Sequence, residues 1–256
     1  MRPADELRDA VEATLLALPL HSELGGLLEP LRYALQPGGK RIRPVLCLAV
    51  TEAAGGSLEE ALPAAAAIEL VHTFSLVHDD LPALDDDDER RGRPSTHVAF
   101  GEGVALLAGD ALLAEAFRLA LTYERTGVAA ELADATVGMI GGQYRDITGD
   151  DEDLETLHRL KTGRLFDAAV RIGLELAGVA GEARRPWIGF AADVGLLFQV
   201  VDDLLDADGY ADRLGAEPAR RLADDVAARA GGRLDEIGAD TSVLRELVAS
   251  IAFRTS

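Results

Sequence analysis

Apolar residues recur three and four positions apart along most of this 256-residue chain, which is the spacing of a helix with one buried face. Glycine, proline and aspartate interrupt the pattern and mark where the predicted helices end. The segments predicted to be helical are Leu7–Leu35 (two helices), Pro44–Ala54, Leu58–Val77, Gly103–Tyr123, Val128–Tyr144, Leu154–Leu176 and Trp187–Leu205. The more polar Glu217–Phe253 predicts two or three short helices. No alternating run is long enough to predict a sheet.

This pattern predicts an all-α protein, a bundle of about ten helices in one domain spanning residues 1–256. Aromatic residues make up only 5% of the chain while apolar residues make up 48%, and the latter are mostly Ala and Leu, which favours helices. No apolar stretch reaches the ~20 residues of a membrane span, and no signal peptide is recognisable. We therefore expect a cytoplasmic protein without membrane insertion. The net charge of -20 argues against nucleic acid as a partner.

Two groups of carboxylates lie beside or within apolar helical sequence. The first places seven acids between His78 and Glu89, and the second places Asp202, Asp203 and Asp206 within Phe198–Ala207. Like charges one helical turn apart repel each other, and bare carboxylates are costly in apolar surroundings. Hard oxygen ligands of this kind suit Mg²⁺, which completes its coordination with water and phosphate. A solvated acidic loop is the alternative interpretation of the first group taken alone.

Lysine is rare in this chain: only Lys40 and Lys161 occur among 25 basic residues. A lysine offers a compact, mobile charge suited to a phosphate oxygen, whereas arginine offers a rigid fork. Lys40 follows Gly38-Gly39 at a predicted turn and stands three residues before Arg43. Turn amides and a helix start both favour an anion there.

The second lysine stands in Lys161-Thr162-Gly163, inside a predicted helix. Thr and Gly are poor helix formers, so a local break is expected. Arg90 and Arg91 follow the first acidic group, and His72 precedes Asp79 by two helical turns. These residues could complete a metal-free diphosphate pocket.

Taken in order, the segments from Leu31 to about Gly209 resemble the trans-polyprenyl diphosphate synthase family, most closely the bacterial farnesyl diphosphate synthases. His72–Gly92 resembles the first aspartate-rich motif in its two-residue-insert form, and Phe198–Asp206 resembles the second. Gly38–Pro44, Gly141–Gln143 and Lys161–Gly163 match the remaining signatures. The resemblance implies the isoprenoid synthase fold, in which mostly antiparallel helices surround a deep central cavity, and usually a homodimer.

The activity implied by this resemblance is head-to-tail prenyl transfer, in which isopentenyl diphosphate is condensed with dimethylallyl or geranyl diphosphate to give farnesyl diphosphate. Three Mg²⁺ ions are implied, held through the substrate diphosphate by Asp79, Asp80, Asp85, Asp202, Asp203 and Asp206. The released diphosphate is expected to take the final proton, so no side chain is expected to act as the base.

The same matching implies roles for the other residues. Isopentenyl diphosphate is expected to be bound by Lys40, Arg43, His72 and Arg91. Arg90 and Lys161 are expected to bind the allylic diphosphate, and Thr162 and Gln199 to stabilise the cation with their oxygens. Product length is expected to depend on Phe74 and Ser75, since Phe74 stands roughly 7 Å before Asp79 along a helix. An aromatic residue there favours a C15 product.

The match fails after Asp206, where the family continues with a Gly-Lys-rich loop and a Lys-Thr-Tyr-Pro-like segment. Ala207–Ala230 contains no lysine, as though about twenty residues were missing. Arg213, Arg220 or Arg221 could substitute for the absent lysine.

Three alternatives stay open beside the farnesyl diphosphate synthase. A geranylgeranyl diphosphate synthase would share every motif and differ in the length of its product. A non-catalytic partner subunit of a prenyltransferase would fit the absent loop. A terpene cyclase would share the first aspartate motif, but it would ordinarily lack the second motif and the isopentenyl diphosphate site.

Overall fold

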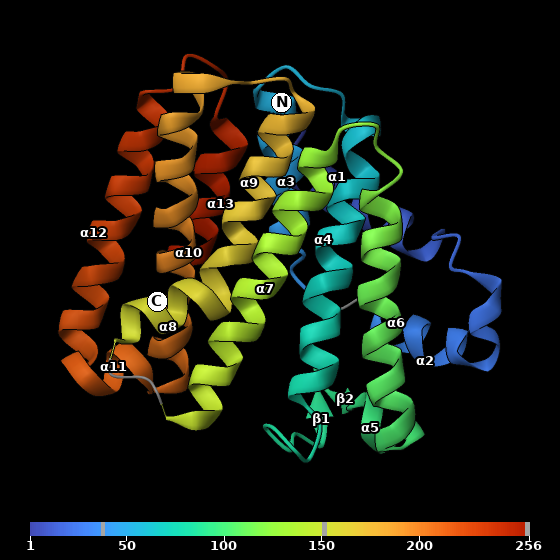
Figure 1. Ribbon diagram of the computed structural model, residues 1–256. Helices are drawn as coiled ribbons and strands as arrows, with labels where there is room; N and C mark the ends of the chain where they lie inside the picture. Colours follow the sequence, from blue (N-terminus) through green and yellow to red (C-terminus); the bar gives the residue numbers. More distant parts are fainter. Residues whose placement is uncertain (37–38, 150–152, 254–256) are drawn as a thin grey trace.

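The computed structural model describes residues 1–36, 39–149 and 153–253, and its elements are helices almost throughout (Figure 1). The all-helical prediction is therefore confirmed. Pro37 and Gly38, from the predicted glycine-rich turn, lie outside the described residues.

Within residues 1–36 and 39–120, the structure describes α-helices, one 3₁₀ helix and a small hairpin. Their bounds are α1 (Ala4–Leu16), η1 (Ser22–Leu27), α2 (Leu28–Ala34), α3 (Ile42–Ala53), α4 (Leu58–Asp79), β1 (Glu89–Arg90), β2 (Arg93–Pro94), α5 (Thr96–Phe100) and α6 (Glu102–Ala120). The two-residue strands pair antiparallel across the turn at Arg91 and Gly92, which is an element that the sequence pattern did not predict.

The second half supplies the rest of the bundle. Its elements are α7 (Thr126–Thr148), α8 (Leu154–His158), η2 (Arg159–Gly163), α9 (Arg164–Leu176), η3 (Gly181–Arg184), α10 (Arg185–Asp206), α11 (Gly209–Leu214), α12 (Ala216–Asp235) and α13 (Ser242–Ala252). Two helices form in Glu217–Phe253, within the predicted two or three, but the first of them is longer than expected. Helix α12 has 20 residues and buries small apolar side chains, and α13 buries Val243, Leu244 and Leu247, because both helices pack against α10.

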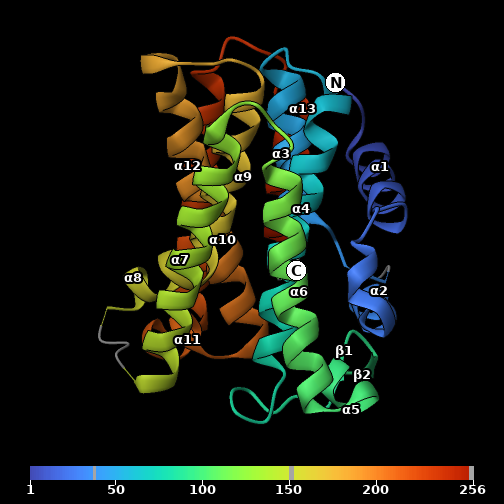
Figure 2. The same cartoon turned by 45° about the vertical axis from the view of Figure 1, so that its right-hand side comes forward.

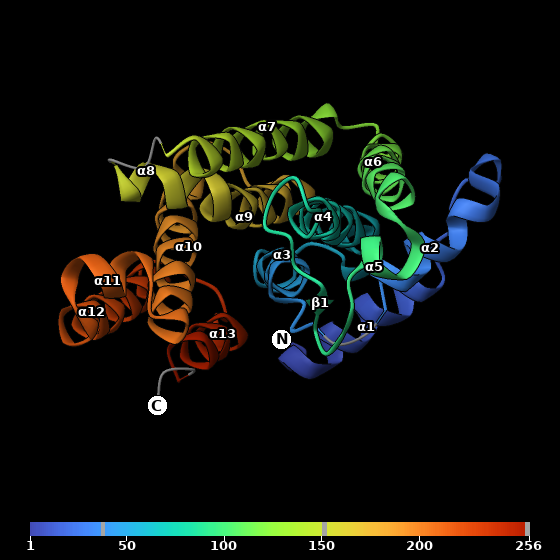
Figure 3. The same ribbon diagram turned by 90° about the horizontal axis from the view of Figure 1, so that it is seen from below.

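Helix α4 lies at the centre of the bundle, packed against α3, α6 and α9 (Figure 3). Pro63 interrupts its hydrogen-bond ladder, since proline has no amide hydrogen and crowds the preceding turn. The hydroxyl of Tyr123 bridges the gap: it accepts from the Ala64 amide at 3.1 Å and donates to the Glu60 carbonyl oxygen. The helix is long and apolar enough to span a membrane, but 67% of that stretch is buried inside the protein. It is therefore a core helix.

Helices α4 and α10 run in the same direction and end at the same end of the bundle, beside β1, β2, α8 and α11 (Figures 1 and 2). Asp79 is the last residue of α4 and Asp206 the last of α10. The two acidic groups, more than a hundred residues apart in the sequence, are thus carried to one end of the molecule.

The predicted break at Lys161-Thr162-Gly163 is confirmed as a π-helical turn, η2, between α8 and α9. A π-turn is wider than an α-turn and often marks a functional site. Two glycines make room for it. A Cβ on Gly142 of α7 would lie 2.4 Å from the Lys161 amide nitrogen, and one on Gly195 of α10 would lie 3.1 Å from the Cα atom of Gly163.

Candidate active site

A basic pocket of about 270 Å³ opens between α3, α4 and the β1–β2 turn. Four of the residues predicted to bind isopentenyl diphosphate line this pocket, namely Lys40, Arg43, His72 and Arg91. The guanidinium group of Arg91 lies directly on the backbone of Gly39, where a Cβ would be only 2.8 Å away. The structure therefore gathers into one cavity side chains that are far apart in the sequence, from Lys40 to Arg91.

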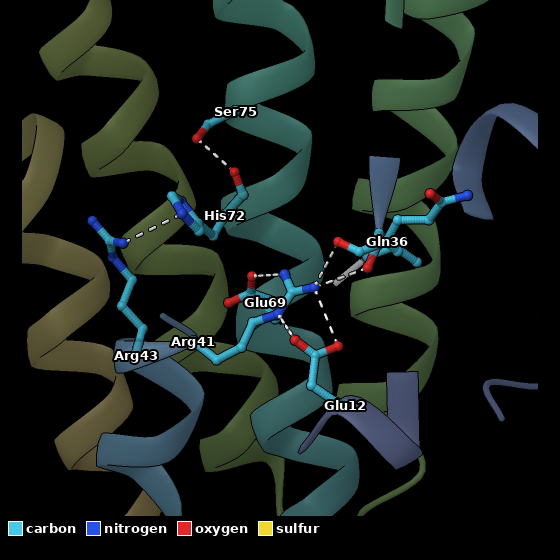
Figure 4. A network of polar contacts seen from close by, with 8 residues as sticks. Glu12, Gln36, Arg41, Arg43, Glu69, His72 and Ser75 are labelled. Atoms are coloured by element: carbon cyan, nitrogen blue, oxygen red, sulfur yellow. Dashed lines mark hydrogen bonds and ion pairs between the residues drawn. The ribbon is translucent and has the colours of Figure 1, made fainter. Parts of the chain in front are cut away.

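A buried ion-pair network contributes Arg41 and Glu69 to the lining of the basic pocket (Figure 4). Arg41 is 3% exposed and adopts a left-handed backbone conformation at the start of α3. Its guanidinium group donates to Glu69 on α4, to Glu12 on α1 at 2.7 Å, and to the carbonyl oxygens of Leu35 and Gln36 at 2.9 and 3.1 Å. Arg41, at the start of α3, thereby connects α1, α4 and the residues that follow α2.

The basic pocket has an excess of positive charge. Burial, helped by the nearby Arg43 and Arg91 charges, lowers the pKa of His72, so its imidazole is neutral near pH 7. Burial also lowers the pKa of the Arg91 guanidinium. Arg43 stacks over the rings of Phe166 and Phe198 at 4.6 and 5.3 Å, and its Nη1 lies 3.5 Å from His72 Nε2. Such crowding is relieved when an anion binds.

A second, apolar cavity of about 260 Å³ lies between the end of α4 and the face of α7. Among its lining residues are Phe74, Ser75, Asp79, Gln143, Tyr144 and Lys161. The ring of Phe74 meets that of His78 edge to face, with centroids 5.0 Å apart. The cavity thus has an aromatic wall and a charged rim.

The rim combines a carboxylate with a lysine. Burial raises the pKa of Asp79 to about 6, with Asp85 adding to the rise while Lys161 opposes it. Lys161 forms an ion pair with Asp146 of α7, and the Asp85 amide donates to the Asp79 carbonyl oxygen at 2.8 Å. No role was predicted for Asp146, although its position three residues after Gln143 is a usable signal in the sequence.

Asp80 and Arg90 were predicted as ligands of metal and diphosphate, yet in the structure they bind each other. Asp80 is 2% exposed and accepts from Arg90 Nε at 2.8 Å, while Arg90 also donates to Asp87 at 2.8 Å. Arg90 lines a cavity beside the β1–β2 hairpin, whereas Lys161 lines the apolar cavity. Both nevertheless lie close enough to lower the pKa of Asp79.

The carboxylates of the second acidic group also differ in whether they are buried and hydrogen-bonded or exposed. Asp203 is 3% exposed and accepts from Gln199 Nε2 at 2.5 Å and from the Tyr210 amide at 2.8 Å, while Asp206 is exposed. Gln199 in turn accepts from the Thr162 hydroxyl at 2.7 Å. The π-turn and the second acidic group are therefore joined by side-chain hydrogen bonds. Asp202 is half-buried on the same helix.

The donors of this site fit Mg²⁺ bound together with a phosphate. Within residues 1–36, 39–149 and 153–253, no three acidic, histidine or cysteine side chains converge closely enough to form a metal site by themselves. Mg²⁺ needs only one or two carboxylates when phosphate oxygens and water complete its octahedron. Asp79, whose pKa is raised to about 6, is the kind of carboxyl that a bound cation would stabilise in its charged form.

The amide of Gln143 is a further polar group for which no role was predicted from the sequence. Its Oε1 and Nε2 atoms are buried without a hydrogen-bond partner among the described residues, and the residue lines the apolar cavity. The only signal for it in the sequence was its place after Gly141-Gly142.

The chain matches a known protein family and several of its members. Residues 26–225 match the model of the polyprenyl synthetase family. The chain is 44% identical over 232 residues to a geranylgeranyl diphosphate synthase of Cyanophora paradoxa, covering 85% of this chain and 77% of that protein. It is 41% identical over 204 residues to the farnesyl diphosphate synthase of Bacillus subtilis strain 168, covering 74% of this chain and 69% of that protein.

Solved structures agree with these matches. A crystal structure described as an FPP/GFPP synthase from Zymomonas mobilis superposes with a TM-score of 0.85 at 31% identity, covering 97% of each chain. The named relatives make products of different lengths, so these similarities do not distinguish a farnesyl from a geranylgeranyl product.

Proposed function

Because this chain belongs to the polyprenyl synthetase family, we propose that it is a Mg²⁺-dependent prenyltransferase that condenses isopentenyl diphosphate with dimethylallyl and geranyl diphosphate to give farnesyl diphosphate. One observation carries the proposal. Helix α4 supplies His72 to the basic pocket and Phe74, Ser75 and Asp79 to the apolar cavity. Two sites of different chemistry, one for a bare diphosphate and one for a hydrocarbon chain ending in a charged group, therefore adjoin one helix.

Isopentenyl diphosphate binds in the basic pocket without metal. Lys40, Arg43 and Arg91 contribute positive charge, and neutral His72 offers a hydrogen-bonding nitrogen. Charge-assisted hydrogen bonds of this kind are about twice as strong as neutral ones. The Arg41 network keeps these groups in place before the substrate arrives.

The allylic diphosphate binds at the rim of the apolar cavity, with its hydrocarbon tail directed toward Phe74. Asp79, Asp85 and Asp202 would hold Mg²⁺ there, with Asp80, Asp203 and Asp206 in support, and bound Mg²⁺ would supply Lewis-acid stabilisation of the leaving diphosphate. Lys161 exchanges its Asp146 partner for a phosphate oxygen. Arg90 stays with Asp80 and adds positive charge from behind.

The reaction follows from this placement. The bond between C1 of the allylic substrate and oxygen breaks, and its electron pair leaves with the diphosphate. The oxygens of Thr162 and Gln199 stabilise the cation. The double bond of isopentenyl diphosphate then forms the new carbon–carbon bond, and the proton lost goes to the released diphosphate. The protein contributes mainly by positioning, which alone can lower a barrier by several kcal/mol.

Product length is decided in this proposal by Phe74, assisted by Ser75. Phe74 is 8% exposed and faces the apolar cavity together with His78. These two rings, which meet edge to face, limit the depth available to the hydrocarbon chain. A geranylgeranyl product would need either ring to move aside, and that product is the second candidate because one relative is a geranylgeranyl diphosphate synthase.

The decisive experiment incubates the purified protein with Mg²⁺, isopentenyl diphosphate and, in separate reactions, dimethylallyl, geranyl or farnesyl diphosphate, and measures the chain length of the dephosphorylated product. Farnesol as the end point supports the proposal, and geranylgeraniol from every primer replaces it with the second candidate. A folded protein that makes no product with any primer contradicts the enzymatic proposal and favours the partner-subunit alternative. Asp79→Asn is the matched inactive control.

We further propose that two copies of the chain associate through the outer face of α6 and α7. The exposed apolar side chains of these helices that do not line the apolar cavity have exposed fractions between 36% and 70%: Val104, Leu106, Leu107 and Val137. Contiguous apolar patches on a soluble protein mark interaction sites. Light scattering of Val137→Glu should give a monomer, while Leu16→Glu on α1, which is 60% exposed, should leave a dimer intact. A wild-type monomer would contradict the proposal.

Two broader properties are part of the same proposal. Residues 1–256 form one polyprenyl synthetase domain, which is supported by a single hydrophobic core that draws on helices from α1 to α13. The protein is cytoplasmic, as expected for an enzyme that acts on charged, water-soluble diphosphates.

A further inference from the structure

The short helix α11 makes close contact with the second acidic group. It begins three residues after Asp206 and lies beside the end of α10. The Tyr210 amide donates to Asp203 Oδ2 at 2.8 Å. The Tyr210 ring stacks on the imidazole of His158, the last residue of α8, with centroids 5.3 Å apart and planes 28° apart. Helix α11 is thereby fastened to both α10 and α8.

Gly209 makes this contact possible. Its φ of +44° is in the left-handed region, and a Cβ there would lie only 2.2 Å from Asp203 Oδ2. Any larger residue would push the Asp203 carboxylate or the α11 backbone aside, in addition to the strain of the backbone conformation.

The contact continues toward the residues assigned to the chemistry. Asp203 accepts from Gln199 Nε2, and the Thr162 hydroxyl donates to Gln199 Oε1. A carboxylate can only accept hydrogen bonds, so Asp203 determines which end of the Gln199 amide faces it. The amide oxygen is thereby directed to Thr162 in the π-turn. His158 Nε2, 3.4 Å from Asp203 Oδ2, closes the other side of the carboxylate.

We propose that Tyr210 and His158 are positioning residues that fix Asp203, and through it Gln199 and Thr162, for prenyl transfer. Neither residue is among those to which the sequence analysis gave a role. Tyr210 acts from α11, at the place where the chain lacks the lysine-bearing segment of the resembled family, and His158 acts from the end of α8. The proposal rests on the proposed function, because it assigns the two rings a part in that reaction.

The test compares Tyr210→Phe, Tyr210→Ala and Gly209→Ala in the full-length protein with Asp212→Ala, an exposed neighbour on α11, as control. Tyr210→Phe retains the ring and should match the wild type. Tyr210→Ala and Gly209→Ala should lower kcat about 10- to 100-fold, as expected for residues that orient a reactive site. The KM for isopentenyl diphosphate should change less than about twofold, because the basic pocket lies elsewhere.

Coupling gives a sharper criterion. If the two rings act as one unit, His158→Ala combined with Tyr210→Ala should be no slower than the slower single variant. The proposal would be overturned if the two single-variant losses in kcat multiply in the double variant. It would also be overturned by a wild-type kcat in Tyr210→Ala, or by an equal rise in the KM of both substrates.

A binding measurement separates this inference from the proposed function. Mg²⁺ with inorganic diphosphate should raise the melting temperature of the wild type and of Tyr210→Phe, since a ligand of the folded state stabilises it. Tyr210→Ala should show a smaller rise at the same concentrations. A wild type that shows the rise but makes no prenyl product contradicts the proposed function alone, whereas equal rises in all variants contradict the positioning role.

Discussion

Replacing Arg41 with leucine should destabilise the protein strongly, because Arg41 and Glu69 form a buried ion pair. Glu69 is 1% exposed and has its carboxylate against the Arg41 guanidinium. Removing one partner of such a pair costs about 3–5 kcal/mol, since the other charge stays buried without compensation. The carbonyl oxygens of Leu35 and Gln36 lose a donor as well. At about 2–4 °C per kcal/mol for a chain of this size, the melting temperature should fall by about 6–20 °C.

The pH dependence distinguishes this mechanism from a simple loss of packing. Burial raises the pKa of Glu69, and Arg41 is the main group opposing that rise. Without Arg41 the pKa of Glu69 rises further. At pH values between the ordinary pKa of glutamate and this raised pKa, the folded state of Arg41→Leu therefore binds more protons than the unfolded state. Stability then falls as pH increases through that range. The loss in free energy of unfolding of Arg41→Leu, relative to the wild type, should therefore be larger at pH 8 than at pH 5.5.

Urea denaturation followed by circular dichroism measures both effects. Arg41→Leu combined with Glu69→Leu should recover much of the lost stability, because it removes the uncompensated charge. Arg8→Leu breaks an exposed ion pair with Asp5 and, as the matched control, should cost less than about 1 kcal/mol. A loss below about 1 kcal/mol in Arg41→Leu that does not vary with pH would refute this account of the network.

Three further predictions concern catalysis. Phe74→Ala should lengthen the product from C15 toward C20 by deepening the apolar cavity, as seen by chromatography of the dephosphorylated products, and an unchanged C15 product would remove Phe74 as the stop. At low Mg²⁺, activity should fall as pH drops through about 6, where Asp79 gains a proton. Higher Mg²⁺ should move this fall in activity to lower pH, because the metal competes with the proton. A pH–activity profile that does not change with Mg²⁺ would argue against Asp79 as a ligand. Gly142→Ala should lower the melting temperature and abolish turnover, because its Cβ would collide with the Lys161 backbone, whereas Gly141→Ala, which meets no atom within 4 Å, should leave both nearly unchanged.

The helices and the chemistry of the two acidic groups were predictable from the sequence because both are local signals. Helical periodicity and breaking residues lie within a few positions of each other, and seven acids in a short stretch need no tertiary context to be noticed. The break at Lys161–Gly163 was visible for the same reason, since Thr and Gly disfavour a helix wherever they stand. Tertiary packing departed from the local pattern at the C-terminal end only in length, because contact with α10 supports a 20-residue α12 where a short helix was expected.

Tertiary structure alone decided which of the similar carboxylates stay open and which are engaged. Asp79 and Asp80 are neighbours in the sequence, yet the first lines the apolar cavity and the second is buried against Arg90. Successive residues of a helix point about 100° apart, so the surroundings of each depend on what packs there. The pairs Arg41–Glu69 and Lys161–Asp146 are set in the same way, because a partner 28 or 15 residues away leaves no trace in the local pattern. The sequence by itself determined the functional groups this protein carries, and packing determined which of them face a substrate.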